Sequence, residues 1–478
     1  MERIYFDKQI FSHLFNSDRQ EYRDFLALLK ANSDNFLYCY SQGHLQDLQN
    51  DKTNIKYDEL AFMETLVGDN YLSYDATEKR TSCYLATPLE AFKDYDKDEE
   101  PLSILSALDN IDLSSMSDEQ RMQIENAKEL IATQKIDFSF TGLKNLLSEK
   151  DTEAVQKVLP LSSGSMTLLD WSNHLMNLLS SMNEDKSIYK GFRNIVDANL
   201  NQGRFTVKYD SIDFNDDLKN SELKKTFIEY VTGNLNPNGE KEVTEYDFYL
   251  NAYLSLDLLG ISKEPSKAVK FRNLMNDGYH SYYGAFCDYV VSDDKGFLKK
   301  TKTMYRLLGI ETKVFDIVEF MSHFPLLIRS IELDSRTFIK LLVNDLKHGL
   351  VVGSKNSVKS NRHTTTIKPT HNYLGYFNSL QTIREDGKEF ILLRRKTKNY
   401  SYFSFFREHA GIVNIAVKIF GIDDNYRSEF SSEKELKEIS DGSWEGRFWN
   451  FDVATIHLQI NEGINELCLL ITIQDTEN

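Results

Sequence analysis

Four aspartates give the sequence its clearest chemical signal. Asp7 directly follows the apolar segment RIYF, and Asp294 follows YVVSD. Asp47 and Asp277 each lie within a segment of helical periodicity near one of these sites. Clustered carboxylates bind hard divalent cations such as Mg²⁺ or Mn²⁺, and such an ion can polarise a phosphate and generate hydroxide. The four acids therefore indicate metal-dependent chemistry on a phosphate ester.

A parallel sheet would bring these acids together. Residues 3–7, 35–41, 288–292 and 310–316 are short apolar segments typical of strands, and segments of helical spacing lie between them at 10–32, 41–51, 266–287 and 295–309. Ligands of open parallel sheets bind beyond the carboxyl ends of the strands, where Asp7 and Asp294 are expected. Asp47 and Asp277 are expected on the helices beside those strands.

The remaining patterns divide the chain into four parts. Residues 1–75 and 266–322 form the two halves of an α/β core, separated by a mainly helical insertion at 76–265. A boundary near Pro325 introduces a β-rich C-terminal domain at 323–478. Within it we expect strands at 390–396, 400–406, 412–421 and 454–473, and a flexible polar loop at 354–371.

Composition limits the class of protein. The 478-residue chain has a net charge of −17 and 41% hydrophobic residues, enough for packed cores. Its apolar runs are shorter than the roughly 18 residues of a membrane span, and its first residues lack a signal-peptide pattern. Four cysteines lie far apart without a CxxC pair, which argues against a zinc module or a disulfide framework. We expect a cytoplasmic protein that makes no membrane contact.

The order of the acids resembles that of PIN-domain nucleases. IYFDKQIFSHL, YSQGHLQDL and NDGYHSYYGAFCDYVVSDDKGF reproduce the family's succession of strand-end and helical acids. Ser292 stands where the family has Thr, and Asp47 where it more often has Glu. The resemblance covers roughly residues 1–75 and 265–322. It implies a PIN-like parallel-sheet core, here interrupted by the helical insertion and extended by the β-rich domain.

The resemblance also implies a function. Asp7, Asp47, Asp277 and Asp294 would hold Mg²⁺ or Mn²⁺ in an endoribonuclease that attacks RNA with an activated water. A toxin-like or antiviral defence role is implied as well. The insertion and the added β domain point to a regulatory protein partner or a homo-oligomer.

Several neighbouring side chains are candidates for orienting the carboxylates or contacting the scissile phosphate. His44 and His280 each lie three residues from a candidate acid, which on a helix places them on neighbouring positions of one face. The full set is Ser12, Ser41, His44, His280, Ser292, Asp293 and Lys295. Ordinary roles compete with these: the serines and Asp294 suit helix caps, and each histidine suits a hydrogen-bonded core position.

Basic segments are candidates for binding the nucleic acid. Because the chain is acidic overall, an RNA substrate would require such local patches. The candidates are Lys299, Lys300, Lys302, Lys355, Lys359, Arg362, Arg394 and Arg395. The last two precede aromatic residues, a combination that suits single-stranded RNA. A solvated strand edge guarded by charge would look the same.

Two other functions compete with the nuclease. A HAD-like phosphatase also uses strand-end aspartates, but it needs a second aspartate two residues after the first, where this chain has Gln9. A non-catalytic PIN-like scaffold would keep the fold without a metal. Geometry separates them, because carboxylates more than about 10 Å apart could not share one cation.

Overall fold

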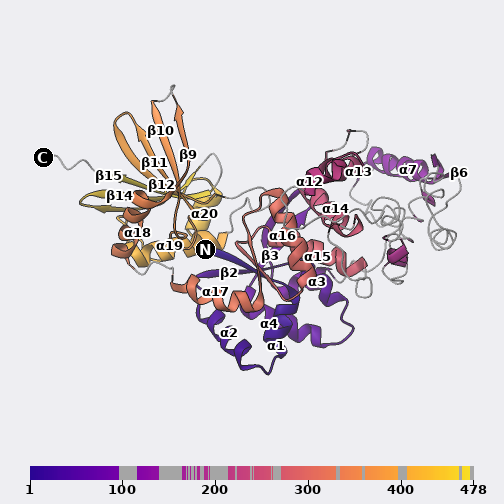
Figure 1. Cartoon of the computed structure of the whole chain (residues 1–478), viewed down its shortest axis with the longest axis horizontal. Coiled ribbons are helices and arrows are strands. Elements are labelled where there is room, and N and C mark those ends of the chain that lie inside the picture. The colour runs from indigo at the N-terminus through magenta and orange to yellow at the C-terminus, as the bar shows by residue number, and fades with distance from the viewer. Residues whose placement is uncertain are drawn as a thin grey trace.

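The computed structural model describes most of the chain. The described segments are residues 1–95, 116–138, 164–167, 214–220, 223–236, 242–259, 271–329, 334–357, 361–396, 406–461 and 466–473, with isolated residues between some of them. Figure 1 shows a central α/β body, a β-rich body at the C-terminal side, and helices of the insertion on the opposite side.

The core is a six-stranded sheet in the order β4-β3-β2-β1-β7-β8. Its strands are β1 (Glu2–Phe6), β2 (Phe36–Ser41), β3 (Asn70–Asp75), β4 (Arg80–Leu85), β7 (Tyr289–Ser292) and β8 (Lys313–Asp316). All neighbours pair in parallel except β3 and β4. The chain builds outward from β1 through β2 and β3, then returns to place β7 on the other side of β1. This reversal creates a crevice at the carboxyl ends of β1 and β7.

Helices cover both faces of this sheet. Ile4 and Phe6 of β1 pack into one apolar cluster and Tyr5 packs into the other, as the alternation of a strand requires. The first cluster includes α1 (Lys8–Asn16), α2 (Gln20–Ala31), α4 (Ile55–Val67) and α17 (Ile317–Arg329). The second includes α14 (Glu245–Leu258), α15 (Phe271–Gly284) and α16 (Lys295–Leu308). The expected helix at 10–32 is thus two helices, broken at Ser17.

Two expected boundaries differ from the structure. The boundary at residue 75 separates β3 from β4, although the two strands pair in one sheet, and α5 (Pro88–Tyr95) also contributes buried residues to the core. Pro325 lies inside α17, whose residue Phe324 is buried in the same core. The core therefore extends beyond both limits, and α14 of the expected insertion covers one of its faces.

The described part of the insertion contains mostly helices. They are α7 (Asp118–Thr133), α12 (Phe214–Asp217), α13 (Phe227–Leu235) and a short 3₁₀ turn at Leu218–Asn220, with a small hairpin of β5 (Lys135–Phe138) and β6 (Gly164–Thr167). No described helix has the length and apolar character needed to cross a bilayer.

The C-terminal domain contains a separate antiparallel sheet, as expected. Its order is β13-β14-β15-β12-β11-β10-β9. The strands are β9 (Leu350–Ser357), β10 (Arg362–Lys368), β11 (Ser379–Glu385), β12 (Lys388–Arg394), β13 (Arg447–Phe451), β14 (Ala454–Asn461) and β15 (Glu466–Ile473), and the helices are α18 (Ser335–His348), α19 (Phe406–Phe420) and α20 (Glu435–Ser440).

Two expectations within this domain are wrong. Residues 412–421 were expected as a strand but belong mostly to α19. Ile412, Ala416 and Ile419 are buried at helical spacing, so the period overrides the strand preference of the β-branched residues. The expected polar loop at 354–371 contains half of β9 and all of β10, which pair along their length. Residues 400–405 of another expected strand lie outside the described residues.

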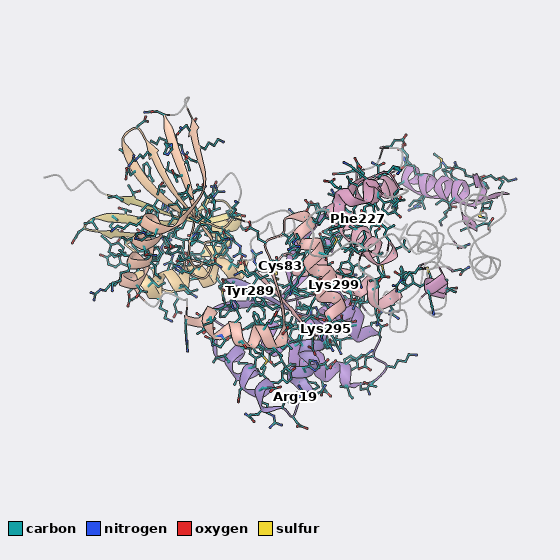
Figure 2. All side chains as sticks on the ribbon, in the orientation of Figure 1. Arg19, Cys83, Phe227, Tyr289, Lys295 and Lys299 are labelled. Carbon is teal, nitrogen blue, oxygen red and sulfur yellow. The ribbon has the colours of Figure 1, made fainter. Side chains whose placement is uncertain are left out.

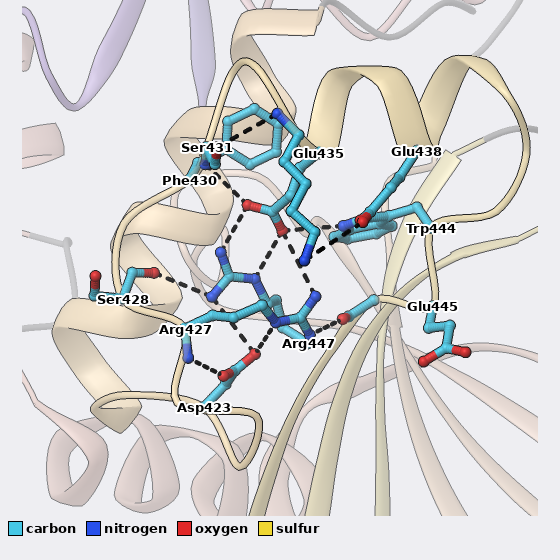
Figure 3. A network of polar contacts seen from close by, with 12 residues as sticks. Asp423, Arg427, Ser428, Phe430, Ser431, Glu435, Glu438, Trp444, Glu445 and Arg447 are labelled. Atoms are coloured by element: carbon cyan, nitrogen blue, oxygen red, sulfur yellow. Dashed lines mark hydrogen bonds and ion pairs between the residues drawn. The ribbon is translucent and has the colours of Figure 1, made fainter.

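A buried polar network ties α20 to β13 (Figure 3). Arg447 donates to both carboxylate oxygens of Glu435, at 2.9 and 2.7 Å, and Trp444 donates to the same carboxylate at 3.1 Å. Arg427 pairs with Asp423 at 2.8 Å. The Arg447 and Glu435 side chains are only 1% and 2% exposed, so each charge depends on the other for its solvation.

The C-terminal domain packs against the amino ends of the core strands. Arg3 at the start of β1 forms a fully buried ion pair with Glu408 of α19, at 2.7 Å. Asp288, just before β7, pairs with Arg395 at 2.8 Å. This contact lies at the opposite end of β1 and β7 from the crevice, so it leaves the carboxyl ends of these strands accessible.

Candidate metal centre

Asp7 lies at the crevice between β1 and β7. It is the N-cap residue of α1, but its side chain makes no capping hydrogen bond. Instead, its Oδ2 accepts a hydrogen bond from the hydroxyl of Ser292 at 2.6 Å. The side chain is 14% exposed. The carboxylate is therefore oriented by the neighbouring strand, with limited contact to solvent.

Asp47 of α3 (Gln42–Gln49) and His280 of α15 complete a compact group with Asp7. One ligand atom from each of the three residues lies within 4.8 Å of the other two. Nε2 of His280 is 3.1 Å from Oδ2 of Asp47 and 3.9 Å from Oδ1 of Asp7. The other oxygen of Asp47 accepts a hydrogen bond from the side-chain amide of Asn276. These are donor atoms of the kind that hold a divalent cation.

Asp277 and Asp294, which were predicted as ligands too, lie outside this three-residue group but interact with it electrostatically. Burial raises the pKa of Asp277 well above its usual range, and the charges of Asp7, Asp294 and Asp47 raise it further. Burial also raises the pKa of Asp7, against the opposing effects of His280 and Ser292. We call the four aspartates the acidic cluster. The ionised carboxylates repel one another, and a bound cation would offset this repulsion.

Asp294 also performs the ordinary role that its position suggested. It is exposed, and its carboxylate caps α16 by accepting a hydrogen bond from the backbone of Phe297 at 2.9 Å. Asp293, one residue earlier, is directed elsewhere: its carboxylate lies 3.6 Å from Nε2 of His13 on α1. The two neighbouring aspartates therefore have separate surroundings.

A buried set of polar groups supports His280. The hydroxyl of Tyr5 lies 2.7 Å from Nδ1 of His280 and 2.6 Å from Oγ of Ser41. Burial lowers the pKa of His280, but the hydrogen bond that it donates to Asp47 and the charges of Asp7 and Asp47 outweigh this and raise it overall. Protonated His280 can donate to Asp47 and to Tyr5 at the same time.

His44 has the hydrogen-bonded core position that competed with a role in contacting substrate. It is fully buried, its Nδ1 accepts from the backbone N–H of Ser41 at 3.1 Å, and its Nε2 donates to the carbonyl of Phe6 at 2.7 Å. Burial and the nearby His280 lower its pKa, which keeps the ring neutral. His44 thus fixes the start of α3 against the residue before Asp7, and it cannot contact a substrate in this arrangement.

Other candidates are less closely connected to the cluster. Ser12 donates to Glu59 at 2.9 Å on the outer helices, so it does not orient the acidic cluster. Lys295 is exposed at the start of α16. Sequence reasoning overlooked Tyr5 and Asn276. Two patterns could have identified them: Tyr5 is two residues before Asp7 on one strand, and Asn276 is four residues before His280 on one helix.

The basic candidates separate by burial. Lys300 is fully buried, with its pKa lowered to about 8 by burial, and Arg395 is 4% exposed in its pair with Asp288. Both predictions of nucleic-acid contact are therefore wrong. Lys299, Lys302, Lys355 and Arg362 are exposed, Arg394 is partly buried, and Lys359 lies outside the described residues. Figure 2 labels Lys295 and Lys299 along α16.

The residues fit a hard or borderline divalent ion. Carboxylates favour Mg²⁺ and Mn²⁺, and the imidazole of His280 favours Mn²⁺ of the two. A histidine that binds a metal through one ring nitrogen commonly donates the N–H of the other nitrogen to a partner that fixes the ring. The hydroxyl of Tyr5 lies where it can be this partner for His280. Comparison of the chain with protein-family models, curated proteins and solved structures finds no match.

Proposed function

We propose that this protein is a metal-dependent endoribonuclease of PIN type. The observation that carries the proposal is the convergence of Asp7, Asp47 and His280 at the crevice between β1 and β7. Asp294 and Asp277 interact electrostatically with the carboxylates of this group. An Mg²⁺ or Mn²⁺ ion bound there would polarise the phosphate and supply a nucleophilic hydroxide.

The chain's own groups have distinct tasks in this proposal. Ser292 orients Asp7, and Asn276 orients Asp47. Tyr5 sets the ring of His280, which either joins the ligand set or remains a proton donor to Asp47. Burial and the neighbouring carboxylates raise the pKa of Asp277, and a cation bound nearby would lower it again.

The proposed substrate is RNA, contacted through local basic surfaces. Lys299 and Lys302 extend along α16, directly after the acid Asp294. Lys355 of β9 and Arg362 of β10 are further exposed cations, on the C-terminal sheet. A toxin-like or antiviral defence role, with a regulatory partner or a second copy of the chain, belongs to the same proposal because the sequence resemblance implies it.

A cleavage assay with a matched control tests the proposal. Purified protein is incubated with single-stranded RNA or DNA and Mn²⁺, and the parent is compared with Asp7→Asn and Asp293→Asn. Asp7→Asn should reduce cleavage by at least about 100-fold, because it removes a ligand charge. Asp293→Asn should retain activity, since its carboxylate faces His13 instead of the cluster.

Two outcomes would lead to other conclusions. Equal cleavage by all three proteins would assign the activity to a contaminant or to another site. Absence of cleavage by the parent, together with no Mn²⁺ binding in calorimetry, would favour the non-catalytic scaffold. The phosphatase alternative has no support at position 9, where Gln9 is exposed on α1.

A further inference from the structure

We propose that a cavity between the two domains binds a small phosphorylated compound. The cavity has a volume of about 590 Å³, within the range of about 300–1,000 Å³ that is usual for small-molecule sites. It lies at the amino ends of β1 and β7, the opposite end of the sheet from the acidic cluster. Neither the proposed metal chemistry nor RNA binding requires it.

Arg395 is the central observation. It lines the cavity and is 4% exposed, and one of its nitrogens, Nη2, donates to Asp288. Its Nε and Nη1 atoms are buried, and the described residues offer them no hydrogen-bond partner. The guanidinium lies 4.9 Å from the ring centre of Tyr376, which fixes its plane. Buried donors are almost always satisfied, so two unpaired guanidinium N–H groups call for an acceptor such as a phosphate oxygen.

The charges around the cavity favour an anion. Its lining contains the exposed lysines Lys313, Lys368 and Lys396 in addition to Arg395. Three acids also line it: Asp288 is neutralised by Arg395, and Glu2 is buried and accepts hydrogen bonds from Tyr289 and Asn372. Glu311 is the third. In a chain with a net charge of −17, this local excess of cations indicates a negatively charged ligand.

The size and construction of the cavity indicate more than free phosphate. A single phosphate would leave most of 590 Å³ unfilled, whereas a nucleoside phosphate would use it. His323 of α17 supplies another buried ring nitrogen, Nε2, for which the described part of the chain has no partner. Figure 2 labels Tyr289, another lining residue, on the side of the core that faces the C-terminal sheet.

The ligand would contact both domains. Asp288, Lys313 and His323 come from the core, and Lys368 and Arg395 from the C-terminal domain. Binding would therefore hold the domains together.

A binding experiment on the full chain tests the site without relying on cleavage. Pyrophosphate, ATP and adenosine are titrated at low salt with EDTA present, so that no metal bound at the acidic cluster can mediate the effect. We expect pyrophosphate and ATP to raise the melting temperature and to bind one per chain in calorimetry, with adenosine inactive. Asp7→Asn should bind them equally, even if it has lost cleavage.

Matched variants identify the location. Lys313→Ala combined with Lys368→Ala should weaken binding of pyrophosphate and ATP by at least tenfold. Lys52→Ala combined with Lys340→Ala removes the same charge from exposed positions outside the cavity and should leave binding unchanged. The proposal is overturned if neither phosphate compound binds the parent, if both double variants lose affinity equally, or if adenosine binds as well as ATP.

Discussion

The side chain of Asp7 joins two segments of the core that are far apart in the sequence. Its backbone N–H donates to the carbonyl of Val291, and its carboxylate accepts from Ser292. A change at Ser292 would therefore disturb the orientation of Asp7 without removing charge. At this scale, the orientation of the carboxylates in the proposed metal site depends on neighbours that a search for acids alone does not find.

The burial of the Glu2 carboxyl group should make the stability of the protein depend on pH. Burial and the charge of Asp288 raise its pKa to about 7 from 4.5. The stability contributed by the protonated form is present below pH 4.5 and is lost as the pH rises through 7. Glu2→Gln should therefore be more stable than the parent at pH 8, by up to about 3 kcal/mol, with the difference vanishing near pH 4.5.

Chemical unfolding at pH 4.5, 6 and 8 would measure this effect. Glu64→Gln removes a carboxylate from an exposed position of α4 and serves as the control. A Glu2→Gln variant that is less stable than the parent at pH 8 would contradict the expectation.

Arg447 allows a comparison of buried and exposed ion pairs within one domain. Arg447→Met leaves Glu435 buried without its partner, so it should destabilise the C-terminal domain by about 3–5 kcal/mol. Arg384→Met breaks an exposed pair with Glu389, whose side chains are 71% and 52% accessible, and should change stability by less than about 1 kcal/mol. Urea unfolding measures both, and equal effects would contradict this account.

At the scale of elements, periodicity predicts more than composition does. The strands at 3–7, 35–41 and 288–292 and the helix at 295–309 are found close to their expected positions. The strand expected at 412–421 is α19, because its apolar run contains both signals and only burial decides between them. The polar stretch at 354–371 was expected as a loop, since its few apolar residues gave no alternation from which pairing could be predicted.

The hairpin of β9 and β10 is the strongest basic feature of the C-terminal sheet. No acid occurs between residues 346 and 384. Lys355 pairs with Thr364 and Arg362 with Ser357, so both cations point to the same face of the hairpin, and both are exposed. This face would contribute to RNA binding by attracting phosphates.

Charge reversal tests this contribution. Lys355→Glu combined with Arg362→Glu should weaken RNA binding and reduce the slope of log affinity against log salt by about 2, since two phosphate contacts are lost. Lys340→Glu, at an exposed position of α18 in the same domain, is the control. Filter binding at several salt concentrations measures the slopes, and an unchanged slope in the double variant would remove the hairpin from the proposed interface.

At the scale of the whole molecule, one buried pair couples the domains. Arg3 lowers the pKa of Glu408 to about 2, against the effect of burial. The stability that this pair contributes is present above pH 4.5 and is lost as the pH falls towards 2. Glu408→Gln should lower stability at neutral pH by about 3–5 kcal/mol, because it leaves Arg3 buried without a counter-charge.

Scanning calorimetry would show the coupling. We expect one transition for the parent and two for Glu408→Gln, as the core and the C-terminal domain begin to unfold separately. Arg407→Gln, which breaks a more exposed pair with Asp69 across the same interface, should keep a single transition. Two transitions in the parent would show that the pair does not couple the domains.

Part of the candidate site could be predicted from local sequence, and part could not. Asp7 and Asp294 follow apolar strands, and this pattern is visible in a few residues. The hydrogen bond from Asn276 to Asp47 and the one between Tyr5 and His280 join residues more than 200 positions apart, so only the sheet order brings them together. The burial of Lys300 and Arg395 depends on packing between elements, so it could not be predicted from the local sequence either.

The strand β1 concentrates several of these relations in one short segment. All five of its residues are buried. Glu2 and Arg3 contact the C-terminal domain, Tyr5 supports His280, and the carbonyl of Phe6 holds His44. In a saturation mutagenesis screen, this segment should be among the least tolerant of the chain. A variant there could lose the contact with the C-terminal domain, the support of His280 or the position of His44. Each variant therefore needs a stability measurement before its phenotype is attributed to chemistry.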